Sequence, residues 1–118
     1  MTSFKQKLLG AGIILGFCSS FASLALAAQP EEYVIAIGDH KFSPAELLIP
    51  AHQKVKLVIE NHDATAEEFE SYDLHREKVV LGHGKIIILI GPLQPGAYKY
   101  FGEFHPKTAV GFIQVQKQ

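Results

Sequence analysis

The stretch PGAYKYFGEFHPKTAVGFIQV, residues 95–115, predicts two strands joined by a polar loop near the end of the chain. A Pro-Gly turn opens the stretch and leads into an aromatic strand, and the segment AVGFIQVQ closes it. The loop between the two strands holds Glu103 and His105. This loop is therefore the first candidate for a functional site.

The preceding residues, from 33 onward, also follow a β pattern. KVKLVIEN alternates, with Val55, Leu57 and Ile59 on one face, and GKIIILIG is a continuous apolar run typical of a strand buried on both faces. About seven or eight short strands, with regular turns and no convincing helical period, predict an all-β antiparallel sandwich or barrel of Greek-key type. The expected core residues are Val34, Leu48, Val55, Leu57, Ile59, Phe69, Val80, Ile87, Leu89, Tyr98, Tyr100, Phe112 and Val115.

The first 27 residues have the features of an export signal. Lys5 and Lys7 give a basic start, residues 8–26 are mostly apolar, and Ala25-Leu26-Ala27 is a small-x-small cleavage site. A membrane anchor is the alternative, which the interrupting glycines and serines disfavour. We expect a signal peptide at residues 1–27, one domain at residues 28–118, and a periplasmic location.

Charge and cysteine content exclude several classes of function. Cys18 is the only cysteine, so the mature chain can form neither a disulfide nor a thiolate metal site. The mature chain has nine lysines and arginines against twelve acidic residues, and this net charge near −3 argues against nucleic-acid binding. The chain also lacks the H-E-x-x-H, G-x-S-x-G, C-x-x-C and phosphate-loop motifs.

The closing stretch resembles a cupredoxin. Pro95, Gly96 and Tyr98 match that family's P-G-x-Y turn and strand, and Gly111 matches the glycine of its last strand. The resemblance covers residues 33–116 and implies the cupredoxin-like Greek-key sandwich.

The resemblance breaks at the copper ligands. His105 falls on the loop histidine, but Gly102 holds the cysteine position, Ala109 the methionine position, and Glu67 the position of the remaining histidine. A blue-copper centre needs a thiolate with two imidazoles, so blue-copper electron transfer is rejected.

Carboxylates replace the lost ligands. The strand EEFES and the loop GEFH are similar to those of the cupredoxin-like periplasmic proteins that accompany bacterial iron permeases, which carry an E-[FW]-E strand. Carboxylate and imidazole suit iron, manganese, zinc or tetragonal copper(II). The resemblance makes iron the leading ion, with copper second, and implies an inner-membrane iron permease and other periplasmic uptake components as partners. The candidate metal ligands are Glu67, Glu68, Glu70, Glu103, His105 and His40.

Simpler explanations exist for each candidate. Glu67 could reach solvent at the end of the sheet, Glu68 and Glu70 could form a solvated face, and the loop side chains could merely cap backbone groups. His40 could join a second metal site, His83 suits a turn between glycines, and Glu77 is a weak addition to the acidic cluster. His52, His62 and His75 are predicted to be surface residues.

Two other functions stay open. One is a ferrous-iron oxidase with a carboxylate-rich copper centre, although the sequence favours binding over catalysis. The other is a metal-free interaction module whose acidic rim docks onto a membrane partner.

Overall fold

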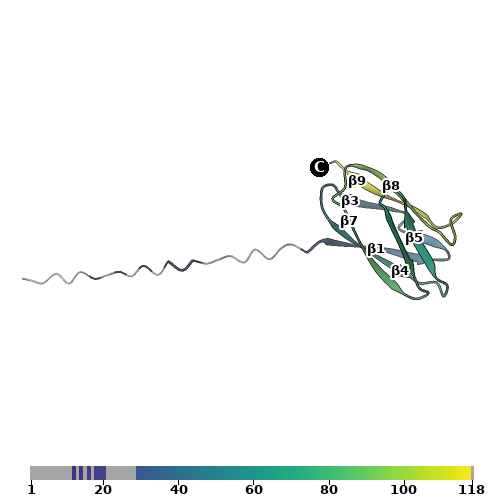
Figure 1. The fold of residues 1–118 in the computed structure, drawn as a ribbon, viewed down its shortest axis with the longest axis horizontal. Helices are drawn as coiled ribbons and strands as arrows, with labels where there is room; N and C mark the ends of the chain where they lie inside the picture. Colours follow the sequence, from purple (N-terminus) through teal and green to yellow (C-terminus); the bar gives the residue numbers. More distant parts are fainter. Residues whose placement is uncertain (1–11, 13, 15, 17, 21–28, 118) are drawn as a thin grey trace, which may run out of the picture.

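Two β-sheets pack face to face in the computed structural model, which describes residues 12, 14, 16, 18–20 and 29–117 (Figure 1). The nine strands are β1 Glu31–Gly38, β2 Lys41–Ser43, β3 Glu46–Pro50, β4 Val55–Asn61, β5 Glu67–Ser71, β6 Arg76–Val80, β7 Lys85–Ile90, β8 Gly96–Gly102 and β9 Val110–Gln116. One sheet has the order β2-β1-β4-β7 and the other the order β3-β9-β8-β5-β6. The predicted all-β sandwich is confirmed.

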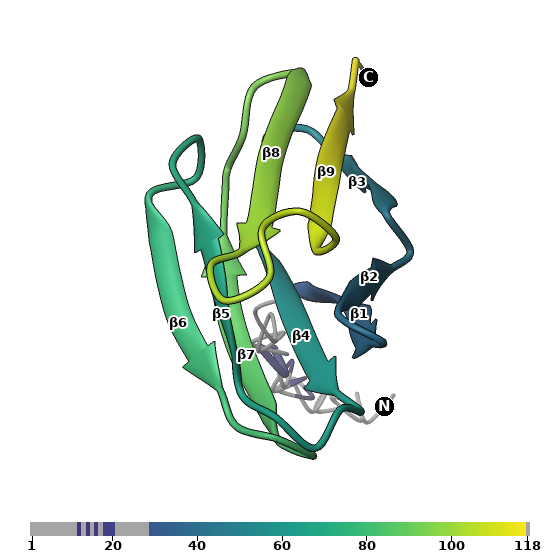
Figure 2. The same ribbon diagram turned by 90° about the vertical axis from the view of Figure 1, so that its right-hand side faces the viewer.

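Two strand pairs differ from the fully antiparallel arrangement that was expected. β1 pairs with β4 in parallel, and β3 pairs with β9 in parallel, whereas the remaining pairs are antiparallel. Figure 2 shows the β8–β9 loop crossing in front of β5, and the Glu103 N–H donates to the carbonyl of Glu68 near the start of that strand. This crossing brings the predicted ligand loop beside the glutamate-rich strand.

The predicted signal peptide at residues 1–27 lies mostly outside the described residues. Cys18, which falls within it, is exposed. No helix in the described part of the chain has the length and apolar character needed to span a membrane.

The core between the sheets contains most of the expected residues, but the prediction is one position out of phase in β1, β3 and β7 and wrong at one position of β9. Five predicted core residues are 36–57% exposed, and the prediction is wrong for them: Val34, Leu48, Ile87, Leu89 and Phe112. Their neighbours in the same strands are buried instead: Ile35, Ile37, Leu47, Ile49, Ile88, Ile90 and Ile113. Apolar residues occupy both faces of these strands, so alternation alone does not fix which face is inside.

The run GKIIILIG is not buried on both faces. It forms β7, which lies at the edge of its sheet and exposes Ile87 and Leu89. Side chains of the other sheet cover this edge, because Arg76 Nε donates to the Leu89 carbonyl at 3.2 Å and Lys78 Nζ to the Ile87 carbonyl at 3.4 Å. Such coverage protects an edge strand from pairing with another chain.

An aromatic cluster packs β8, which leads into the ligand loop, against β2 and β5. The Tyr100 ring lies 4.9 Å from that of Phe42 and 5.1 Å from that of Phe69. Tyr100 pairs with Gly111 across β8 and β9, and a Cβ at Gly111 would lie 2.3 Å from Tyr100 Cζ. Only glycine fits under this ring, and burial raises the pKa of the Tyr100 hydroxyl.

Adjacent residues of β1 test which face of this strand is buried. Ile35→Ala should lower the free energy of unfolding by about 2–5 kcal/mol, because Ile35 is fully buried. Val34→Ala, which trims a half-exposed neighbour, should cost less than about 1 kcal/mol. Urea unfolding measures both, and equal losses of unfolding free energy would contradict the burial of Ile35 rather than Val34.

Candidate metal centre

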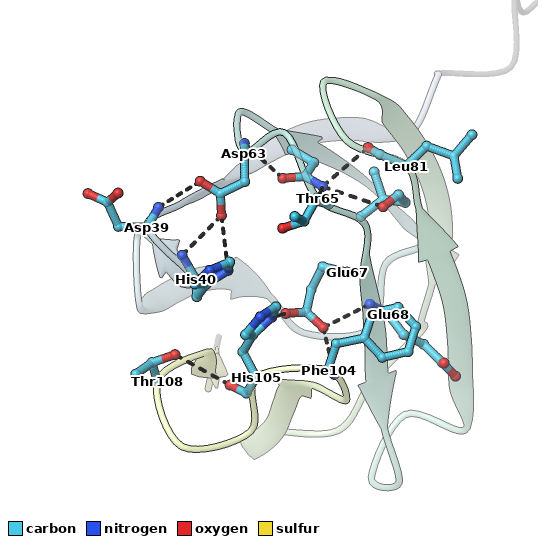
Figure 3. A network of polar contacts seen from close by, with 12 residues as sticks. Asp39, His40, Asp63, Thr65, Glu67, Glu68, Leu81, Phe104, His105 and Thr108 are labelled. Atoms are coloured by element: carbon cyan, nitrogen blue, oxygen red, sulfur yellow. Dashed lines mark hydrogen bonds and ion pairs between the residues drawn. The ribbon is translucent and has the colours of Figure 1, made fainter.

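Glu67 at the start of β5 is a buried carboxylate with its hydrogen bonds satisfied. It is 2% exposed. Its Oε1 accepts the backbone N–H groups of Glu68 and Phe104, each at 2.9 Å, and its Oε2 lies 2.7 Å from His105 Nδ1 (Figure 3). The carboxylate therefore tethers the β8–β9 loop to β5, so the predicted meeting of strand and loop is confirmed.

Glu67 also occupies the space in front of Gly102, the residue at the cysteine position of the family pattern. A Cβ at Gly102 would lie 2.5 Å from Glu67 Cδ and 2.8 Å from Ala109 Cβ. The sole cysteine, Cys18, is far outside this motif in the sequence. A blue-copper centre does not fit these residues, because its thiolate is missing and a carboxylate fills the place.

His40 lies against His105. Their rings stack with centroids 3.6 Å apart and planes 13° apart. His40 Nδ1 is 3.5 Å from Asp63 Oδ2, just as His105 Nδ1 contacts Glu67, so each imidazole faces its own carboxylate. Carboxylates often orient metal-binding histidines in this way.

Asp63, which the sequence reasoning missed, positions His40. It accepts the backbone N–H groups of Asp39 at 2.8 Å and His40 at 3.0 Å. These two residues form the turn between β1 and β2, with φ values of 50° and 57°. The N–H of His40, and then that of Asp39, hold the pKa of Asp63 below its usual value.

Asn61 holds the β4–β5 loop that carries Asp63. Its Oδ1 accepts the Asp63 N–H at 3.0 Å, and its Nδ2 donates to the carbonyls of Thr65 at 2.8 Å and Leu81 at 3.2 Å. The loop sequence NHDATA contains the family's N-x-D pattern, so this pattern was the available signal for both residues.

A second group of carboxylates lies on the outer face of the same sheet. Neighbouring residues of a strand point to opposite faces, so Glu67 faces inward while Glu68 and Glu70 face outward. Strand pairing places Glu77 of β6 directly opposite Glu70. Carboxylate oxygens of Glu68, Glu70 and Glu77 all lie within 4.8 Å of one another. We call these three residues the outer cluster.

Glu103 stands beside the outer cluster. Its backbone N–H donates to the Glu68 carbonyl at 2.9 Å. Burial raises the pKa of Glu68, and the charges of Glu77, Glu103 and Glu67 raise it further. The negative charges of these residues therefore repel one another on this face.

Glu70 is the least compensated member of the outer cluster. Glu70 as a whole residue is 7% exposed, and the ion pairs of the described residues include no cation for it. Burial raises its pKa, and so do the contact with Glu77 and the charges of Glu68 and Glu103. Carboxylates that face one another without a cation form a site where a cation would be favoured.

The structure thus divides the six predicted ligands into two groups. Glu67, His105 and His40 form the inner group, while Glu68 and Glu70 belong to the outer cluster with Glu103 at its edge. Glu77 joins the outer cluster fully, although its sequence signal was weak. His83 lies in the β6–β7 turn with φ of 56°, as its flanking glycines predicted, and its N–H donates to the Asp63 carbonyl at 2.9 Å.

Comparison with known proteins agrees with this architecture. An uncharacterized protein of Rickettsia prowazekii (strain Madrid E) is 54% identical over 84 residues, which are 71% of this chain and 67% of that protein. The "blue" copper protein auracyanin A of Chloroflexus aurantiacus superposes with a TM-score of 0.64 at 15% identity, over 75% of this chain and 100% of its own. The purple cupredoxin of Nitrosopumilus maritimus gives a TM-score of 0.54 at 22% identity, over 73% of this chain and 99% of its own.

The identities to these solved structures are low, so they establish the fold alone. The family model of the cupredoxin-like domain matches residues 11–115. Most of the chain, including both carboxylate groups and the ligand loop, lies within this match. The protein therefore belongs to the cupredoxin-like domain family.

Proposed function

We propose that this protein is a periplasmic binding protein for a transition-metal cation, iron first and copper second, and that it supports iron import by an inner-membrane permease. The cupredoxin fold is typical of metal-binding and electron-transfer proteins, and a blue-copper centre does not fit here. The outer cluster supports metal binding, while iron and the permease rest on the resemblance of the EEFES strand and GEFH loop to iron-uptake proteins.

The observation that carries the proposal is the state of Glu70. The residue is 7% exposed, and its carboxylate faces those of Glu68 and Glu77 without a cation, which carries an electrostatic cost. A bound metal ion would remove that cost, because it would replace repulsion between carboxylates with attraction to all of them. Oxygen ligands of this kind suit hard and borderline cations.

The inner group is the second candidate site. His40 and His105 each face a carboxylate through Nδ1, which would leave Nε2 available to a metal. However, Glu67 already accepts three hydrogen bonds, and a metal would have to compete with these donors. The outer cluster requires no such exchange, so we place the ion there.

Calorimetric titration with Cu²⁺, and with Fe²⁺ under anaerobic conditions, tests the proposal. The wild-type protein should bind at micromolar concentration, and Glu70→Gln/Glu77→Gln should lower the affinity at least about 100-fold, or about 2.7 kcal/mol. Glu67→Ala/His105→Ala should retain binding if it folds. The matched control is Glu46→Gln, an exposed glutamate of β3 that lies outside both groups.

Two results would contradict the proposal. Absence of micromolar binding by the wild-type protein would remove the metal-binding function and favour the interaction module. Unchanged binding by Glu70→Gln/Glu77→Gln would remove the outer cluster as the site, and loss only in Glu67→Ala/His105→Ala would move it to the inner group. Oxygen consumption with Fe²⁺, measured with and without copper, separates a ferrous-iron oxidase from a binding protein.

A further inference from the structure

The outer face of the β2-β1-β4-β7 sheet carries a line of apolar side chains. Strand pairing places Val34 of β1, Val58 of β4 and Ile87 of β7 side by side across the sheet, and we call these three residues the apolar row. Val34 is 45% exposed, Ile87 is 46% exposed, and Leu89, the next outward residue of β7, is 48% exposed. Large apolar side chains that meet on one exposed surface are typical of an interaction site, whereas single ones are not.

Val58 shows that the apolar row is continuous. Its neighbours along β4, Leu57 and Ile59, are fully buried in the core, so Val58 points to the outer face. It is nevertheless only 5% exposed, because Val34 and Ile87 stand directly opposite it on either side. The outer face therefore presents one packed apolar strip.

Charged residues lie on both sides of the apolar row. On one side Glu32 pairs with Lys56, and their side chains form an ion pair at 3.4 Å. On the other side Glu60 of β4 stands opposite Lys85 of β7. Two glutamates and two lysines give these outward positions of β1, β4 and β7 no net charge. A partner of strongly positive or strongly negative surface therefore gains little from this face.

The order of charges along β4 makes the face complementary to itself. Two sheet faces that pack in the aligned manner keep their strand directions within about 30° of each other. A two-fold axis that runs along the apolar row sets Val58 against its own copy and sets Lys56 against Glu60 of the second copy. A two-fold axis along β4 would instead set Lys56 against Lys56 and Glu60 against Glu60. Only the first arrangement joins opposite charges in both copies.

We infer that a second copy of this chain docks face to face on the outer surface of β1, β4 and β7, with the two-fold axis along the apolar row. Pairing through the edge of β7 is blocked, because Arg76 and Lys78 donate to its carbonyls. Three outward side chains from each of three strands make a small interface, so the dimer should be weak, with a Kd of about 10–500 µM. The outer cluster lies on the opposite face of the sandwich and stays accessible in both copies.

Sedimentation equilibrium of the purified protein, over about 5 µM to 1 mM, tests the inference. A chelator is present, so the result does not depend on metal binding. The wild-type protein should show a monomer–dimer equilibrium. Lys56→Glu sets glutamates against glutamates and Glu60→Lys sets lysines against lysines, so each should weaken the dimer at least about tenfold. An equal mixture of the two variants should form the dimer again, because each contact between them joins a glutamate to a lysine.

Two further variants complete the test. Ile87→Ser changes no charge and should weaken the dimer at least about fivefold by interrupting the apolar row. Glu46→Lys, at an exposed glutamate of β3 in the other sheet, is the matched control and should leave the equilibrium unchanged. Circular dichroism shows whether each variant is folded. A wild-type protein that stays monomeric at 1 mM, unchanged dimerisation in Lys56→Glu and Glu60→Lys, or a mixture as monomeric as its components would overturn the inference.

Discussion

Gly102→Ala should lower the free energy of unfolding by about 3 kcal/mol, a large loss for a substitution that adds one methyl group. The new Cβ would lie 2.5 Å from Glu67 Cδ and 2.8 Å from Ala109 Cβ. Glu67 cannot easily move aside, because three hydrogen bonds fix its carboxylate. Gly38→Ala is the control, since a Cβ there meets nothing within 4 Å.

A double-mutant cycle shows whether Glu67 causes this loss. Glu67→Ala alone should cost about 3 kcal/mol, because it leaves the N–H groups of Glu68 and Phe104 and the His105 ring without their acceptor. The same change vacates the space that a Cβ at Gly102 needs. The double variant should therefore be less destabilised than the sum of the two losses, by at least about 1 kcal/mol in urea unfolding.

Strict additivity in that cycle, or wild-type stability of Gly102→Ala, would contradict the packing of Glu67 against Gly102. The consequence would reach beyond stability. This contact is the structural reason why a side chain at the cysteine position, and hence a blue-copper centre, is incompatible with the protein as it is.

Glu70→Gln should have the opposite effect and stabilise the metal-free protein at neutral pH. The raised pKa of Glu70 means that the fold favours its protonated form, so the charged form is a cost that glutamine removes. We expect the melting temperature to rise by roughly 2–6 °C, whereas Glu46→Gln should leave it nearly unchanged. Added Cu²⁺ should raise the melting temperature of the wild-type protein and not that of Glu70→Gln.

The pH dependence of this effect has a definite sign. Below the ordinary glutamate pKa of about 4.3, Glu70 is protonated in both the folded and unfolded chain, and its cost is absent. As the pH rises through its raised pKa in the folded protein, the cost develops fully. The gap in melting temperature between Glu70→Gln and wild type should therefore widen from pH 4 to pH 7. A gap that stays constant or reverses would contradict the uncompensated charge.

The contrast between Glu67 and Glu70 indicates a division of roles within one five-residue strand. Glu67 receives donors from its own strand and from the ligand loop, so it organises the loop as a structural element. Glu70 receives none outside the cluster, so it suits a ligand. If this division is correct, Glu67→Ala lowers the stability of the folded protein and Glu70→Gln raises it.

Some of the fold could be predicted because its signals are local. KVKLVIEN has polar residues between apolar ones, and its buried face was predicted correctly at Val55, Leu57 and Ile59. The strands β1, β3 and β7 carry apolar residues at successive positions, so the sequence contained no information about their inward face. Packing against the opposite sheet, which chooses Ile35 over Val34, settled that choice.

The candidate site was predictable in its main residues and in the meeting of the EEFES strand with the ligand loop, and not in its full membership. The final strands and the missing thiolate indicated a cupredoxin relative with carboxylates in place of copper ligands. Glu77 had only a weak sequence signal, because it meets Glu70 across a hairpin. Asp63 had only the N-x-D pattern, because it accepts hydrogen bonds from a turn that is distant in the sequence.

By itself, the sequence determined that the domain is a β-sandwich of this family and that no sulfur ligand is available in its loop, since both follow from residue types along the chain. The tertiary structure alone decided which glutamate is satisfied and which is not. The reason is that neighbouring side chains of a strand leave on opposite faces, and the groups they meet there come from β6, from the β8–β9 loop and from turns far away in sequence.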